Sequence, residues 1–316
     1  MTSAERRLAF RSTAIAAALV VVLSSCTLAA AQSCAATIRS CVCIIDAPGK
    51  YSVGAPLVGS SGADCIAITA HHVTLDLQGN PITGPGAPEN FRSGIHVRRH
   101  AHHVTIEGDG AAISRFASGI EIDGANVTAR NLSADDNSTG VLIVGSISGT
   151  HTCACGLFPL CPPPASHNSI EKGEASNNGT RGVLVSGGSE NTVERVEANN
   201  NGYAGICVFL GNRNRIANFT ADSNGCYGVD VSHLFCPEQQ CIPPLPPAKH
   251  NSIEKGEASN NGAYGIDLAR GSHRTRVTGN TTSANGTDDL FDVNSHCDHD
   301  QWKGNTFATS NQACIH

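Results

Sequence analysis

The chain lacks the features of several common protein classes. After residue 31, no apolar run approaches the ~18 residues that a membrane-spanning helix needs. Its 21 Lys and Arg and 27 Asp and Glu form no large block, so no strong field attracts nucleic acid phosphates. The 14 cysteines include no CxxC…CxxC pair of the kind that binds zinc. These absences argue against an integral membrane protein, a nucleic acid-binding protein and a zinc framework.

The segment 1–31 has the layout of an export signal. Arginines precede the apolar run AIAAALVVVL, and small residues follow it. Two processing sites stay open: LAAA before Gln32 suits a signal peptidase, whereas LSSC ending at Cys26 resembles a lipoprotein box. We expect a periplasmic or extracellular protein that contacts a membrane only if Cys26 carries a lipid. Thirteen cysteines follow residue 31, which fits an oxidising compartment and leaves at least one thiol unpaired or bonded between chains.

One stretch of the sequence occurs twice without a change. HNSIEKGEASNNG fills 167–179 and again 250–262, with weaker copies between them. The leading Asn residues of the first three copies, Asn168, Asn191 and Asn214, lie 23 residues apart. A period in the twenties indicates a solenoid, and the absence of LxxLxL excludes the leucine-rich type.

A second pattern, glycine followed by apolar-x-apolar, recurs along the same region. Its copies are GIHV (94–97), GIEI (119–122), GVLI (140–143), GVLV (182–185), GICV (205–208), GVDV (228–231) and GIDL (265–268). Alternation over three or four residues between Gly and Asn is typical of very short strands. Successive copies can pair only in parallel, through right-handed crossovers. We therefore predict an all-β fold, a right-handed parallel β-helix with coils of about 23 residues.

The pattern also predicts how the chain is divided. We expect an N-terminal cap and entry over 32–70, a parallel β-helix over 71–293 and a C-terminal cap over 294–316. Loop insertions at 146–166 and 233–249 leave the helix after equivalent strands. These loops are either the two walls of a ligand cleft or mere protrusions tied by disulfides.

Stacked coils place equivalent residues directly above one another, which gives the repeated Asn a role. The predicted row comprises Asn178, Asn201, Asn224, Asn261 and Asn285. Amide side chains in such a row can hydrogen-bond along the stack. Two of these residues, Asn178 and Asn285, also begin N-x-S/T sequons, but we favour the ladder over glycosylation.

The sequence resembles the secreted parallel β-helix repeat proteins of the pectin-lyase-like superfamily. The segment 49–84 (GKYSVGAPLVGSSGADCIAITAHHVTLDLQGNPITG) is similar to their entry into the helix, and 294–316 to their closure. The superfamily holds pectate lyases, polygalacturonases, alginate epimerases and copper-loading periplasmic proteins. The resemblance therefore implies the architecture and leaves the activity open.

The resemblance also implies a candidate site. Alginate epimerases and lyases carry YG(F/I)DPH, in which Tyr, Asp and His surround the sugar carboxylate, and YGVDVSH at 227–233 is similar. It implies Tyr227, Asp230 and His233 as catalytic residues, although DP is missing and His233 falls one position late. On the neighbouring coils, Tyr203, Tyr264 and Asp267 are the corresponding substrate-binding candidates. The alternative is that these residues only follow the strand consensus, with Asp at its outward position.

Other polar motifs predict no site. Asp288-Asp289 resembles the DD of polygalacturonases, but no GHG or RIK follows, which favours a solvated loop. HCDHD (296–300) and HAHH (100–103) offer metal-binding side chains without a spaced set of ligands on one face. We therefore assign no metal ligand and expect no cofactor, while calcium at stacked carboxylates stays open.

Two disulfides follow from spacing and export. Cys236 and Cys241 can pair within the second loop, and Cys297 and Cys314 can close the C-terminal cap. The pairing of the other cysteines stays open.

The functional expectation is an exported β-helix protein that binds a polysaccharide or a cell-surface glycan, without established catalysis. One alternative is a lyase or epimerase that acts on acidic sugars, and a second is periplasmic copper handling. Whether the protein is an enzyme, and its oligomeric state, stay open.

Overall fold

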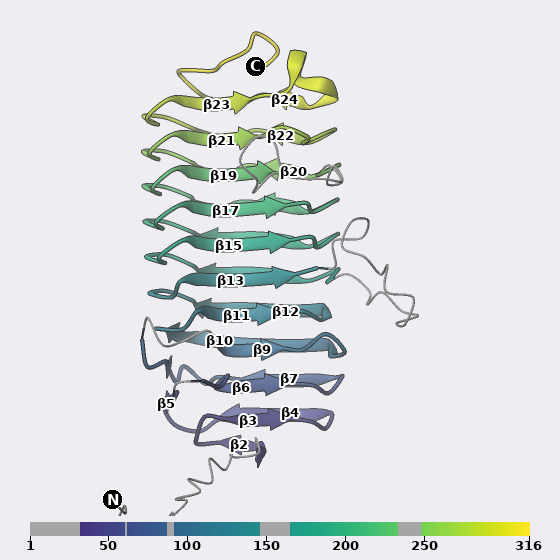
Figure 1. The fold of residues 1–316 in the computed structure, drawn as a ribbon, viewed down its shortest axis with the longest axis vertical. Coiled ribbons are helices and arrows are strands. Elements are labelled where there is room, and N and C mark those ends of the chain that lie inside the picture. Colours follow the sequence, from purple (N-terminus) through teal and green to yellow (C-terminus); the bar gives the residue numbers. More distant parts are fainter. Residues whose placement is uncertain (1–31, 61, 87–91, 146–164, 233–247) are drawn as a thin grey trace, which may run out of the picture. The chain divides into compact units, whose positions relative to one another are not determined.

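A computed structural model describes residues 32–316 except 61, 87–91, 146–164 and 233–247. In this part of the chain two long sheets consist of parallel strands that stack in chain order, as the colour gradient in Figure 1 shows. Each strand pairs with its counterpart one coil earlier and one coil later, which is the arrangement of a parallel β-helix. The predicted fold class is therefore confirmed.

The 11-stranded sheet carries the glycine-apolar-x-apolar segments. Its strands are, in spatial order, β1 (Gln32–Ser33), β3 (Cys43–Ile45), β6 (Ile66–Ile68), β9 (Ser93–Val97), β11 (Ser118–Ile122), β13 (Thr139–Val144), β15 (Arg181–Ser186), β17 (Ala204–Phe209), β19 (Tyr227–Ser232), β21 (Tyr264–Leu268) and β23 (Asp288–Asp292).

The 13-stranded sheet carries the other half of each coil. Its main path is β2 (Thr37–Ile38), β4 (Gly49–Val53), β7 (Val73–Asp76), β10 (His102–Ser114), β12 (Ala125–Ser133), β14 (Ser169–Glu174), β16 (Thr192–Glu197), β18 (Arg215–Ala217), β20 (Ser252–Glu254), β22 (Arg276–Thr278) and β24 (Gln301–Lys303), while β5 (Leu57–Val58) and β8 (Ile82–Thr83) pair beside it.

The strand register reproduces the sequence period. Arg181 pairs with Ala204 and Ala204 with Tyr227, two steps of 23 residues. The next step, from Tyr227 to Tyr264, is longer because the second insertion falls within it. The register then continues to Asp288 on β23.

The core consists of aliphatic side chains stacked from coil to coil. One such row runs through Val183, Ile206, Val229, Ile266 and Leu290, all fully buried and in register. Each coil buries its apolar face only against neighbours of the same shape, so duplicating a coil extends the core without new packing.

The predicted Asn ladder is present and buried. The backbone N–H and the side-chain amide of Asn178 both donate to Asn201 Oδ1, at 2.9 and 3.0 Å. The same pair of hydrogen bonds links the other members in turn: Asn201 to Asn224, Asn224 to Asn261 and Asn261 to Asn285. The side chain of Asn178 is buried, and both its oxygen and its amide group form hydrogen bonds within the ladder, so it has no room for a glycan.

The residue before each ladder Asn explains the recurrent NN and SN dipeptides. It lies in the left-handed region of φ, where Asn and Ser are tolerated better than β-branched residues. These residues are Asn177 (φ 58°), Asn200 (58°), Ser223 (59°), Asn260 (58°) and Ala284 (57°).

The stacked strands extend beyond both predicted cap boundaries. Strands β1 to β6 lie within 32–70 and already pair in parallel, and β24 lies within 294–316 and pairs with β22. These terminal strands lack the glycine-apolar-x-apolar pattern, so the repeat alone does not reveal them.

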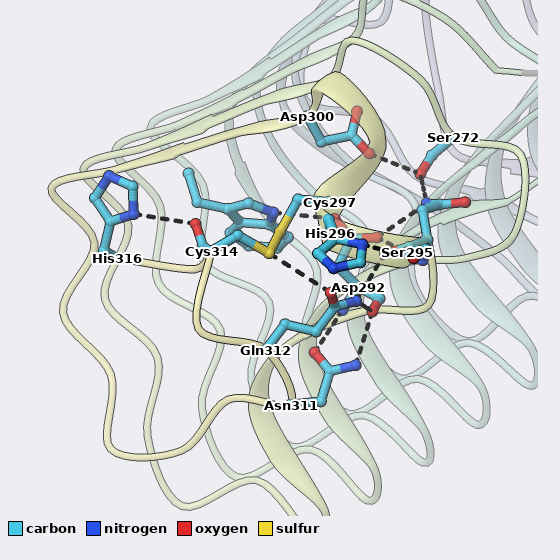
Figure 2. Close-up of a disulfide and its surroundings, with 12 residues drawn as sticks. Ser272, Asp292, Ser295, His296, Cys297, Asp300, Asn311, Gln312, Cys314 and His316 are labelled. Carbon is cyan, nitrogen blue, oxygen red and sulfur yellow. Dashed lines mark hydrogen bonds between the residues drawn. A yellow bond between two sulfur atoms is a disulfide. The ribbon is translucent and has the colours of Figure 1, made fainter.

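The C-terminal segment closes the last coil (Figure 2). Cys297, in the short 3₁₀ turn η1 (Ser295–His299), forms the predicted disulfide with Cys314. The indole N–H of the buried Trp302 donates to Asp292 Oδ2 at 3.2 Å. The first coils hold two further disulfides, Cys34–Cys43 and Cys41–Cys65.

Of the other cysteines, some lie outside the described residues and two are described as free thiols. Cys236 and Cys241 lie outside the described residues, so their disulfide stays a prediction. Cys207 and Cys226 have free thiols. In the parts of the chain that the structure describes, no helix is long and apolar enough to cross a membrane.

Candidate binding face of the eleven-stranded sheet

The x position of the repeated strand consensus forms one row across the 11-stranded sheet. Its side chains alternate with the buried aliphatic ones and therefore face away from the core. In register, the row contains His96, Glu121, Leu142, Leu184, Cys207, Asp230, Asp267 and Phe291.

Asp230 and Asp267 are neighbours in this row. Asp230 is 4% exposed and Asp267 is 6% exposed, although they face outward. Cys207 Sγ and Ser232 Oγ donate to Asp230 Oδ2 at 3.5 and 3.3 Å. Asp267 Oδ1 is buried and has no hydrogen-bond partner among the residues that the structure describes. The pair therefore places two carboxyl groups side by side with few donors to stabilise their charges.

Burial changes the protonation of this pair. It raises the pKa of Asp230 to about 6, although hydrogen bonds from Cys207 and Ser232 and the charge of Arg181 oppose the shift. Burial, with repulsion from Asp230 and Asp292, raises the pKa of Asp267 well above its usual range. Near neutral pH the pair consequently retains a proton that an ordinary carboxyl has lost.

An aromatic ladder of Tyr203, Tyr227, Tyr264 and Phe291 lies beside the carboxyl pair. Adjacent ring centroids are 5.2 Å apart edge to face, then 5.8 and 4.3 Å apart in stacked pairs. The Arg181 guanidinium lies over the Tyr203 ring, 4.7 Å from its centroid. Three of the chain's four tyrosines stand in this ladder, so the scarce aromatic residues are concentrated here.

The tyrosines of the ladder stay protonated. Burial and the Asp230 carboxylate raise the pKa of Tyr203 to about 12. Burial, followed by the effects of Tyr203, Asp267 and Asp230, raises the pKa of Tyr227 further. Both phenols therefore remain hydrogen-bond donors at neutral pH, on half-buried side chains that offer an apolar ring face.

The family model described as "Right handed beta helix region" matches residues 163–312. This match and the two parallel sheets show the right-handed parallel β-helix fold. A comparison with curated proteins finds no match.

Solved structures match the chain at low identity. The Azotobacter vinelandii mannuronan C-5 epimerase AlgE6 A-module is 13% identical, with 87% of this chain and 81% of that chain covered and a TM-score of 0.51. The periplasmic alginate epimerase AlgG is 16% identical, with coverage of 72% and 51% and a TM-score of 0.49. Pectate lyase Pel9A is 14% identical, with coverage of 88% and 70% and a TM-score of 0.47. This chain thus spans about half the length of the AlgG structure.

The β-helix brings together most of the site residues expected from sequence. Tyr227 and Asp230 lie on β19, Tyr264 and Asp267 lie at the same positions of β21, and Tyr203 contacts Tyr227 edge to face.

Some expectations fall outside the described residues. His233 is among them, so its convergence with Tyr227 and Asp230 stays a prediction. The same holds for most of the two loops, 146–166 and 233–249, and for the cleft between them.

The Asp288-Asp289 motif differs from the expected solvated loop. Asp289 is buried rather than solvated, and it accepts hydrogen bonds from the backbone of Ala308 and Thr309. Burial raises its pKa, but these bonds and those from Asn285 outweigh burial and lower it. In HAHH, His102 and His103 contact each other edge to face, 6.1 Å apart. Asp289 thus anchors the C-terminal segment.

A second polar cluster was missed by motif reading. His96 and Glu121 occupy the x positions of GIHV and GIEI, and they become neighbours in the outward row. An alignment of the repeats by their glycines would have predicted that His96 and Glu121 are neighbours. Asp64 and Asp123, which complete the cluster, lie outside the consensus segments.

Proposed function

We propose that this β-helix protein binds a polysaccharide along the outward face of strands β15 to β23. The observation that carries the proposal is the aromatic ladder that spans consecutive coils. Sugar rings have apolar C–H faces and polar edges, and ligand sites combine aromatic surfaces with a few placed polar groups. Coils stack at ~4.8 Å, so such contacts repeat along an extended polymer.

The polar groups beside the ladder fit hydroxyl-bearing ligands. The phenols of Tyr203 and Tyr227 donate hydrogen bonds, and the half-protonated Asp pair can both donate and accept. Asp267 Oδ1 offers a buried acceptor that no group of the described residues uses. The mannuronan epimerase AlgE6 has the same fold, which agrees with a polysaccharide ligand but is an analogy of fold. Three disulfides in the described residues agree with an exported protein.

A polysaccharide array, run with and without calcium, tests binding. The wild-type protein should retain at least one polysaccharide, and the Tyr227→Ala/Tyr264→Ala double variant should lose about tenfold or more in affinity, because two ring contacts disappear. Tyr51→Ala is the matched control, since Tyr51 lies on β4 of the other sheet and bonds to Ala47 O. Absence of binding to every polysaccharide, or equal losses in the two variants, would reject the proposal.

Catalysis on an acidic polysaccharide is a second candidate, favoured by the near-neutral pKa of Asp230. A lyase or epimerase removes the proton next to the sugar carboxylate, and a carboxylate with a pKa of about 6 can accept it. Tyr227 would donate a proton to the departing oxygen in a lyase, or to the opposite face of the sugar in an epimerase. Asp230→Asn should then abolish product formation, while the ring contacts of the aromatic ladder keep the polysaccharide bound. If wild-type protein converts none of the polysaccharides that it binds, binding alone remains.

A further inference from the structure

A cluster of charged side chains lies on the same sheet as the aromatic ladder, on the N-terminal coils. His96 on β9 is buried, with its Nδ1 3.2 Å from Asp64 Oδ2 and its Nε2 3.2 Å from Asp123 Oδ2. Glu121 Oε2 lies 3.8 Å from Nδ1. One imidazole is therefore enclosed by three carboxylates.

The geometry of three of these side chains suits a metal ion. One ligand atom each from His96, Glu121 and Asp123 lies within 4.8 Å of the others, and no other group of the described residues does this. An ion with bonds of about 2.0–2.2 Å to nitrogen and oxygen holds its ligands at most about 4.4 Å apart. Small side-chain rotations therefore suffice to close the cluster around an ion.

The surrounding groups hold these ligands in place. Asp64 accepts hydrogen bonds from the Ser93 backbone N–H at 3.0 Å and from Arg98 at 2.6 Å. It is thus fixed to accept the Nδ1–H of His96, which leaves Nε2 for the ion, the usual carboxylate–histidine–metal arrangement. Ser93 Oγ donates to Glu121 Oε2 at 2.6 Å and orients the second ligand.

The charge balance also favours a divalent ion. Three carboxylates face one guanidinium, that of Arg98, and the imidazole. Without an ion, the three carboxylates therefore outnumber the one fixed positive charge, that of Arg98. A divalent cation with neutral imidazole compensates them completely.

We propose that this β-helix carries a divalent transition-metal site formed by His96 Nε2, Glu121 and Asp123, with Asp64 as the positioning residue. One imidazole and two carboxylates suit Mn²⁺ or Zn²⁺ better than Ca²⁺, which prefers oxygen ligands alone. The side chains of Glu121 and Asp123 are 26% and 24% exposed, which leaves space for entry and for water ligands. The site is independent of the proposed polysaccharide binding, which lies on β15 to β23.

Titration calorimetry on the full chain after chelator treatment tests the site, with Mn²⁺, Zn²⁺ and Ca²⁺ as separate ligands. Wild-type protein should bind one equivalent of Mn²⁺ or Zn²⁺ at this site and prefer it to Ca²⁺. Glu121→Gln and Asp123→Asn should each weaken that binding at least tenfold. Both changes are at partly exposed positions and conserve shape, so melting curves can confirm that the variants fold.

His102→Gln is the matched control, because the half-buried His102 ring lies tilted against His71 with a centroid distance of 3.9 Å, and such paired imidazoles attract Zn²⁺ nonspecifically. It should leave the proposed site unchanged. Asp64→Asn should weaken binding and also change the electron paramagnetic resonance spectrum of bound Mn²⁺, as expected for a positioning residue. The proposal is overturned if neither metal binds, or if Glu121→Gln and Asp123→Asn bind as tightly as wild type.

Discussion

Asp230 lies directly beside Asp267 in the register of β19 and β21, and both carboxyl groups are buried. Like charges opposite each other on neighbouring strands are destabilising, so the duplication of YG-apolar-Asp would weaken a fully ionised sheet. Retention of a proton by the pair resolves the conflict. The stability of the β-helix and its binding face are consequently linked to pH.

The first prediction concerns this pH dependence. Because folding raises the pKa of Asp230 from about 3.8 to about 6, the contribution of the pair is fully present below pH 4 and is lost as the pH rises through 6. The change in the free energy of unfolding that Asp230→Asn causes should therefore be more stabilising at pH 7.5 than at pH 4, by about 1–3 kcal/mol. Guanidinium unfolding at both pH values measures it. The half-buried Asp288→Asn is the control, and equal effects of the two changes would contradict the account.

The second prediction concerns the Asn ladder. Asn201→Leu removes the acceptor for both N–H groups of Asn178 and leaves them buried without partners. We expect a loss of about 1–3 kcal/mol in the free energy of unfolding. Asn200→Asp, at the exposed neighbouring position, should change it by less than about 0.5 kcal/mol. An unchanged melting temperature for Asn201→Leu would show that the ladder contributes nothing.

The third prediction concerns the C-terminal cap. Cys314→Ser opens the bond to Cys297 and should destabilise the protein by about 3 kcal/mol, the value that chain entropy gives for a loop of this size. Amide exchange should rise first in β23 and β24, which the cap covers. Cys226→Ser, which removes a free thiol, is the control. Recovery of Cys297 and Cys314 as alkylated free thiols from the untreated wild-type protein would contradict the cap structure.

The sequence is most informative where a residue type repeats. The Asn ladder follows from Asn201 and its equivalents because a fixed period and a parallel stack determine which atoms meet. The aliphatic core follows for the same reason. Tyr227 and Tyr264 come together because each begins the same short motif.

Contacts between segments that do not repeat cannot be predicted from the period of the sequence. Asp64 contacts His96 from a different part of the preceding coil. It also accepts a hydrogen bond from the backbone N–H of Ser93, which lies 29 residues later in the sequence. The burial of Asp230 is equally hidden, because alternation predicts that the side chain faces outward and says nothing about what shields it. The protonation of the pair depends on that burial and could not be predicted.

The most direct test of polysaccharide binding at the aromatic ladder is hydroxyl-radical footprinting with mass spectrometry, using the polysaccharide that the array selects. Bound polymer should protect Tyr203, Tyr227, Tyr264 and Phe291 from oxidation, while Tyr51 on the other sheet stays as reactive as in the free protein. Protection of Tyr51 or of other surfaces, with the four ladder residues unchanged, would contradict the account.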